Sequence, residues 1–223
     1  MMGLKHNWYI LGLSLISGIS SCNDGKKIDR KLVDEVNKAN EVKKLSEAEI
    51  TTHAMKWGEK ISMEAQKALM GTLQKAIQEK GPEGAVSFCN VEALGITKEV
   101  ADKYKVTIKR VSVKNRNPKN VPNEKEKELL DAYAYNSENK IENQANIQKI
   151  EDGQVLLFTK AITIPNGLCL NCHGQPGKEI QEGTVEKIKN LYPDDKAINY
   201  QVGDLRGMWS IAMPKKEVVK GIE

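Results

Sequence analysis

The sequence has few aromatic residues and no strong excess of charge of either sign. Phenylalanine, tryptophan and tyrosine together make up 5% of the 223 residues, whereas charged residues make up 29%. This composition is typical of a well-solvated protein with a modest hydrophobic core. The formal net charge of +4 is spread along the chain in runs of mixed sign, so the sequence gives no indication of nucleic-acid binding.

Several patterns on which enzymes depend are also missing. The sequence has no internal repeat and no glycine-rich phosphate-binding loop, and neither a nucleophile–base pair nor a pair of carboxylates stands out. We therefore expect the protein not to be an enzyme that relies on its own side chains. Its chemistry is expected to come from a bound cofactor.

A hydrophobic run long enough to cross a bilayer is absent. The apolar run from Trp8 to Ile19 covers only about a dozen residues, which suits the core of a signal peptide. The small residues before Cys22 resemble the lipobox of bacterial lipoproteins, in which the cysteine becomes the first mature residue and is acylated. The alternative is an ordinary cleaved signal followed by an incidental cysteine.

These features predict three segments. We expect a lipoprotein signal peptide at residues 1–21, a charged tether at 22–45 and a folded domain at 46–223. The mature protein is then an exported bacterial lipoprotein, anchored to a membrane through Cys22 on the periplasmic or cell-surface side. Three of the four cysteines would remain in the folded part, and an odd number does not suit a disulfide framework.

Hydrophobic periodicity predicts helices in the first half of the domain. Ser46 and Glu49 have capping-box spacing, and apolar residues then recur about every 3.6 positions to Ala76. Gly81 and Pro82 should end this helix. We expect a second helix over 82–93 and a third over 98–104.

The second half alternates strand and helix signals. The pattern predicts a bulged strand over 105–113, a helix from Asn123 to Tyr135, a hairpin of 147–150 with 154–164, a loop over 165–177, a helix over 183–191 and a last strand over 205–213. This order predicts an α+β domain, in which an antiparallel sheet carries helices on one side.

The motif with the most chemical content is Cys169-Leu170-Asn171-Cys172-His173. C-x-x-C-H is the pattern for covalent attachment of c-type haem, because two thiols form thioethers with the porphyrin and the adjacent histidine binds the iron. Two alternatives stay open. A thioredoxin-like dithiol would need its first cysteine at a helix start in a βαβ setting. A zinc site would need a second pair of ligands.

The sixth iron ligand is less clear from the residues. Met208 and Met213 follow the motif but fall in the last predicted strand, where core packing is the simpler explanation. His53 is out of register with the apolar stripe of its helix, which predicts a solvent-facing side chain. Cys89 lies on a short helix, where a lone cysteine is usually a small core residue.

Several patches together resemble a family of exported monohaem c proteins with a PAS-like fold, whose members are small cytochrome-like proteins and haem sensor domains. The patches are Ala85–Cys89, Arg116–Asn123 with Glu126, Cys169–Gly174, Tyr192–Ala197 and Tyr200–Gly207. The resemblance implies a PAS-like antiparallel sheet with flanking helices and a long N-terminal helix. It also implies one covalent haem c, with a Cys89 thiolate as sixth iron ligand.

The sequence departs from the family pattern at two points, and the roles of two further residues stay open. The stretch Val111–Lys114 differs from the Ser-Leu-Lys or Ser-Leu-Arg frequent in the family, and the 223 residues contain no kinase or transducer module, so we expect any signalling to need a partner. Arg116 and Arg206 have two interpretations of equal weight. They either pair with the haem propionates, as arginine does with carboxylates, or brace their own loop and strand.

The function expected from these residues is one-electron transfer at the membrane surface with an unknown redox partner. One alternative is a haem-based redox or gas sensor that works through a signalling partner. Another is a periplasmic dithiol oxidoreductase, which would be colourless.

Overall fold

The computed structural model describes residues 29–31, 33 and 45–222, with Cys89 described by its backbone alone. The chain divides into units Met1–Lys44 and Leu45–Glu223, and the fold below is that of the second. The predicted signal peptide and Cys22 lie outside the described residues, as does most of the predicted tether. Among the described helices, none combines the length and hydropathy required to cross a membrane.

The longest element is α2, which runs from Glu47 to Tyr104. Its predicted capping box is confirmed, since the Ser46 and Glu49 side chains each accept from the other's backbone N–H. Gly81 has φ 68° and ψ 176°, a conformation that favours glycine, and it divides α2 into a first limb, 47–80, and a second limb, 82–104. The helix end predicted at Ala93 is wrong.

The second limb continues past Ala93 because its next turns are well supported. Ile96 and Val100 pack in the same hydrophobic cluster as Ala93. The hydroxyl of Thr97 also donates to the carbonyl oxygens of Ala93 and Leu94, so its polar group is satisfied within the helix.

Four antiparallel strands form one sheet in the order β1-β4-β3-β2. The strands are β1 Thr107–Val111, β2 Asn146–Ile150, β3 Val155–Thr163 and β4 Leu205–Pro214. The predicted hairpin is confirmed, and Glu151–Gly153 connects its strands.

The bulge predicted in the first strand is wrong, because β1 pairs with β4 in an unbroken register and the irregularity lies between Ile162 and Thr163 of β3. The apparent slip arises because Ile108 and Val111 face opposite sides of a sheet that is covered on both.

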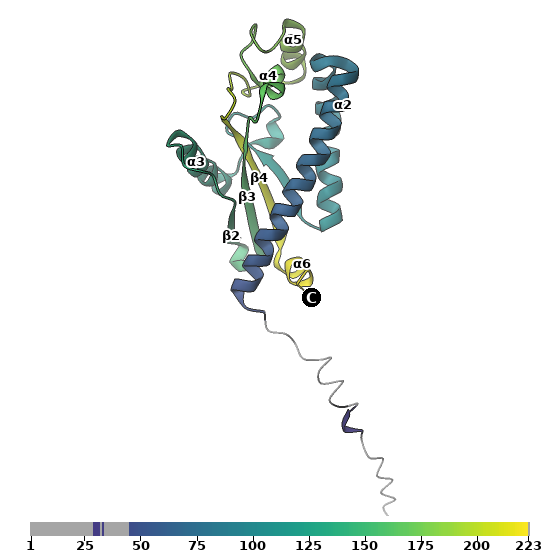
Figure 1. Cartoon of the computed structure of the whole chain (residues 1–223), viewed down its shortest axis with the longest axis vertical. Coiled ribbons are helices and arrows are strands. Elements are labelled where there is room, and N and C mark those ends of the chain that lie inside the picture. Colours follow the sequence, from purple (N-terminus) through teal and green to yellow (C-terminus); the bar gives the residue numbers. More distant parts are fainter. Residues whose placement is uncertain (1–28, 32, 34–44, 223) are drawn as a thin grey trace, which may run out of the picture. The chain divides into compact units, whose positions relative to one another are not determined.

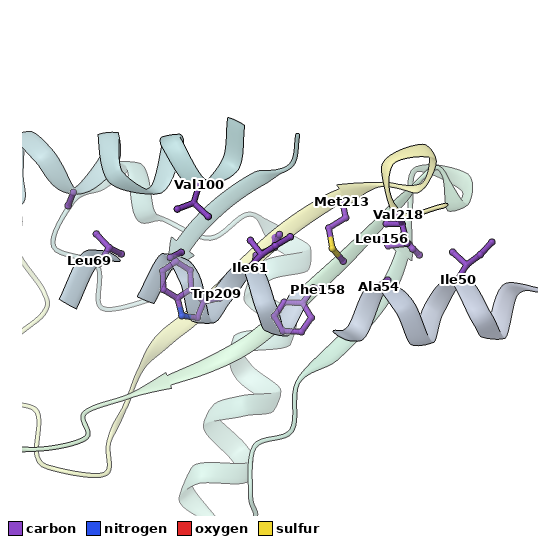
Figure 2. Packing of buried hydrophobic residues seen from close by; sticks show 13 residues of the cluster. Ile50, Ala54, Ile61, Leu69, Val100, Leu156, Phe158, Trp209, Met213 and Val218 are labelled. Carbon is purple, nitrogen blue, oxygen red and sulfur yellow. The ribbon is translucent and has the colours of Figure 1, made fainter. Parts of the chain in front are cut away.

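Helices pack on both faces of the sheet, which corrects the expected one-sided arrangement (Figure 1). The α2 face is the main core, where Ile61 and Leu69 pack against Phe158 and Trp209 (Figure 2). On the other face lies α3, Glu124–Glu138, whose Leu130 joins Val111 and Met208 in a second cluster. The capping box of Asn123 and Glu126 that begins α3 is confirmed.

Three shorter helices complete the domain: α4 Gly167–His173, α5 Glu182–Leu191 and α6 Lys215–Lys220. Helix α5 confirms the helix predicted over 183–191, whereas α6 was not predicted. The loop predicted over 165–177 is partly wrong, since α4 forms inside it. The Asn166 side chain caps this helix by accepting from the Leu168 N–H. The α+β class is confirmed, while the likeness to PAS domains stays a prediction.

Candidate functional site

A cavity of about 250 Å³ lies where α2, α4 and one end of the sheet meet. Leu69, Met70, Leu73 and Ile77 of the first limb line it with the spacing of one helix face. Ala85, Val86 and Ala93 of the second limb line it as well. The α2 side of the cavity is therefore largely apolar.

The C-x-x-C-H motif lies on α4 at the wall of this cavity. Cys169, Cys172 and His173 all line it, and all three are half-buried. Cys169 packs against the cluster of Ile164, Ala197 and Tyr200, whereas Cys172 packs against the cluster that contains Val86 of α2. The structure thus brings the predicted attachment residues and the predicted iron ligand to one apolar cavity.

The imidazole of His173 is held in one tautomer. Its Nδ1 lies 2.8 Å from the carbonyl oxygen of Ala197, which has only acceptor capacity, so Nδ1 carries the proton and donates. Burial lowers the pKa of His173 well below its usual value, and the positive charges of Arg206 and Arg116 lower it further. The neutral ring therefore has its lone pair on Nε2, the nitrogen that a metal would bind.

Arg116 joins three segments around the motif. Its guanidinium makes two hydrogen bonds of 3.1 Å to the carboxylate of Asp195 and donates to the carbonyl oxygens of Cys172, at 2.6 Å, and Ala197, at 3.2 Å. The Arg116 and Asp195 side chains are only 12% and 8% exposed. His173 and Arg116 share one acceptor in the Ala197 carbonyl, so the loop at 116 holds both α4 and the His173 ring.

Arg206 is placed differently from Arg116. Its Nε is buried and has no hydrogen-bond partner among the described residues, while one terminal nitrogen donates to the Lys114 carbonyl at 3.3 Å. Burial lowers the pKa of Arg206 from its ordinary value. Arg110 and Arg116 line the same cavity, and the charge of Arg116 is paired with that of Asp195.

The other candidate iron ligands, Met208, Met213 and His53, do not line the cavity. Met208 and Met213 are fully buried in the core, and neither lines the cavity, which confirms the packing interpretation. The prediction of a solvent-facing His53 is wrong. Its ring is half-buried beside Trp57, and its Nε2 is inaccessible because the C-terminal Gly221 lies against it.

The position of Cys89 can be described only by its backbone. It lies on the second limb of α2, one turn from Ala85 and one turn from Ala93, both of which line the cavity. Among the described side chains, no group of three or more His, Cys, Asp or Glu residues is arranged to hold a metal ion.

Sequence reasoning missed several residues of the site. Asp195 and Ala197 lie in a patch that the resemblance singled out, but nothing in that patch indicated that they orient Arg116 and His173. The ring of Tyr200 lies edge-on to His173 at a centroid distance of 6.1 Å. The face of α2 from Leu69 to Ile77 was visible as apolar periodicity, which does not distinguish a cavity wall from core.

Comparisons with known proteins identify the family of this chain. A search of curated proteins gives no match. The crystal structure of the cyanobacterial heme-protein Tll0287 matches with a TM-score of 0.46 and 24% sequence identity, over 65% of this chain and 94% of that chain. The sequence profile described as Tll0287-like matches residues 30–214, most of the chain. The chain therefore belongs to the Tll0287-like family.

Proposed function

We propose that the chain is a c-type haem protein, with Cys169 and Cys172 as thioether attachment points and His173 Nε2 as an iron ligand. The observation that carries this proposal is the hydrogen bond from His173 Nδ1 to Ala197. It gives a neutral imidazole with an available Nε2, on the wall of the cavity that both thiols also line. The family is named after Tll0287, a heme protein, which is consistent with this proposal.

The cavity suits the two parts of a haem. A porphyrin ring is apolar, and the α2 wall offers Leu69, Met70, Leu73 and Ile77 to it. The propionates are anionic, and the guanidinium groups lie on the same cavity. The bound haem would supply one-electron redox chemistry, and the protein would supply ligands, orientation and electrostatics.

The two arginines have different roles in this proposal. Arg116 is engaged by Asp195 and two carbonyl oxygens, so it acts as a brace for α4. Arg206 has a buried Nε without a described partner and lines the cavity, so it is the better residue to pair with a propionate. The proposal thus assigns one of the two interpretations to each arginine, whereas from the sequence alone both interpretations had equal weight.

The function we infer is one-electron transfer at a membrane surface, with Cys22 as the lipid-anchored residue. A Cys89 thiolate as sixth ligand is supported by the family resemblance and by the cavity-lining residues one turn to either side of it. A thiolate would favour ferric iron and lower the reduction potential.

The dithiol oxidoreductase is less well supported. A redox-active cysteine needs a depressed thiol pKa, and burial instead raises the pKa of Cys169. Cys169 does lie in the first turn of α4, as this alternative requires, but the neighbouring strands β3 and β4 are antiparallel and do not form a βαβ unit.

The test is covalent haem retention. The protein is produced in a host with c-type maturation machinery, denatured and analysed by haem staining and intact mass. We expect one haem per chain that organic solvent does not extract. Cys169→Ser and Cys172→Ser should each lose one thioether, and the double variant should lose covalent haem. Cys89→Ser is the matched control, since it removes a thiol outside the motif and should keep the haem attached.

Two results would contradict the proposal. A colourless wild-type protein from that host would exclude it, and so would a haem that acidified solvent extracts completely.

Binding of carbon monoxide to the ferrous protein, linked to a change in partner binding, would favour the sensor over the electron carrier.

A further inference from the structure

Tyr200 contacts the ring of His173 at a nearly perpendicular angle. The two ring centroids are 6.1 Å apart, and the ring planes meet at 84°. The backbone N–H of Tyr200 also donates to the His173 carbonyl oxygen at 2.9 Å. The tyrosine is therefore tied to the histidine through both its main chain and its ring.

Tyr200 is itself held in place. Its side chain is 6% exposed and packs with Ile164 and Ala197. Two cations lie against its ring, with Lys114 Nζ at 4.2 Å and Arg206 Cζ at 5.5 Å from the centroid. Contacts of this kind stabilise a cation over an aromatic face and restrict the motion of both partners.

The hydrogen bond from Nδ1 to Ala197 does not fix the His173 ring completely. It fixes the tautomer and limits rotation about the Cβ–Cγ bond, but a single hydrogen bond leaves the imidazole plane some freedom to tilt. An aromatic ring that meets the imidazole edge-on at 84° opposes such a tilt, because a change of angle disturbs the favourable contact between the two rings. Tyr200 therefore adds a second restraint, from a different direction, on the plane of the imidazole.

We propose that Tyr200 is the positioning residue that sets the plane of the His173 imidazole and, through it, the electronic properties of the bound haem iron. This inference rests on the proposed haem function. It concerns the ring of Tyr200, since no hydrogen bond of its hydroxyl contributes to the contact with His173. The orientation of an axial imidazole is a recognised means by which a protein tunes its metal.

The proposal is tested by two variants of the haem-loaded protein. Tyr200→Phe keeps the ring and should match the wild type in reduction potential and in the haem-methyl shifts of the ferric ¹H NMR spectrum, which report the plane of the axial imidazole. Tyr200→Leu removes the ring and should shift both. Tyr200→Met fills a similar volume without a ring and replaces the leucine variant if that protein does not fold.

The control is Tyr133→Leu, which removes another buried tyrosine, 5% exposed, on the α3 side of the sheet. It should lower stability and leave the NMR pattern and the potential unchanged. A wild-type pattern in Tyr200→Leu or Tyr200→Met would overturn the inference, as would a shift in Tyr200→Phe as large as that in Tyr200→Leu. Absence of covalent haem from the wild type would instead overturn the proposed function.

Discussion

At the residue scale, the buried ion pair of Arg116 and Asp195 holds the site together. The pair is bidentate and nearly inaccessible, so loss of the carboxylate charge would leave the buried guanidinium without an opposite charge and with neutral acceptors only. Asp195→Asn should therefore lower the free energy of unfolding by about 3 kcal/mol, as measured by urea denaturation.

The matched control is Asp131→Asn, which breaks an exposed pair with Lys127 on α3. Exposed pairs of this kind contribute less than about 0.5 kcal/mol. Equal losses in the two variants would mean that Arg116 is not the brace described above.

Cys89 gives a second prediction at this scale. Cys89→Ala should change the spin state of the ferric protein and raise the reduction potential, because a neutral ligand replaces a thiolate. Haem attachment should survive, since in the proposed site the thioethers would belong to Cys169 and Cys172. The vacated position should go to water or to Met70, which lines the cavity, and not to Met208, which is buried on the α3 side of the sheet.

Absorption spectroscopy and a redox titration of Cys89→Ala make this measurement. A small loss of stability with an unchanged ferric spectrum and potential would show that Cys89 is only a packing residue.

Cys169, Cys172 and His173 could be singled out from the sequence because they form one contiguous motif, and the structure brings all three to one cavity. The orientation of His173 could not, because it depends on a backbone carbonyl 24 positions away. The different roles proposed for Arg116 and Arg206 also depend on hydrogen-bond partners that are distant in the sequence and close only in the folded chain. Sequence shows which charges exist, and tertiary structure determines which of them are neutralised.

At the scale of elements, Gly58 and Gly71 of α2 give two opposite predictions for substitution by alanine. A Cβ on Gly58 would lie 2.3 Å from the ring of Phe158, so this close approach of helix and sheet requires glycine. Gly58→Ala should destabilise the fold by about 1–3 kcal/mol through overpacking, more than the gain in helix propensity.

Gly71 lies on the same helix. Apart from the helix's own nearby backbone, no atom of the described residues lies within 4 Å of the position that an alanine methyl group would take there. Gly71→Ala should stabilise the protein by about 0.5–1 kcal/mol, because alanine loses less conformational freedom in a helix. Thermal unfolding of both variants distinguishes the two effects, and stabilisation by both would show that helix and sheet are less closely packed at Gly58.

The start of α2 gives a prediction about pH. Glu47 forms ion pairs with Lys149 of β2 and Lys215 of α6, and hydrogen bonds from these lysines lower its pKa from 4.5 to about 2. A carboxyl pKa that is lower in the folded state stabilises the fold above the unfolded pKa. The stability difference between wild type and Glu47→Gln should thus be constant near neutral pH and vanish as the pH falls from about 4.5 to 2.

Acid titration of the unfolding free energy of both proteins makes this comparison. A difference that persists at pH 2 would assign the effect to packing of the side chain and not to its charge.

Most elements could be predicted because caps and periodicity are local signals. Ser46 with Glu49, and Asn123 with Glu126, marked helix starts that the structure confirms. The errors arose where tertiary packing overrides local preference. The second limb of α2 continues through Gly95 because its face is buried, and α4 forms in a short Gly- and Pro-bounded segment that its Asn166 cap and its neighbours support.

At the scale of the whole molecule, the proposed lipid anchor at Cys22 would decide where the protein works. Cys22→Ser should release the protein from membranes, because the acyl chains would have no attachment site. Fractionation and mass spectrometry of the mature N-terminus test this. A wild-type mature form that begins elsewhere and carries no acyl chains would contradict the anchor while leaving the haem site unaffected.

The contact between Arg116 and the Cys172 carbonyl has a consequence for biogenesis. Under the proposed function, an enzyme that ligates haem would have to bring a porphyrin edge to both thiols, whereas in the structure a buried guanidinium holds the backbone of one of them. We therefore expect haem ligation to precede formation of this contact. The proposed order of assembly is then export, ligation and final folding, and a chain that folded too early would escape maturation.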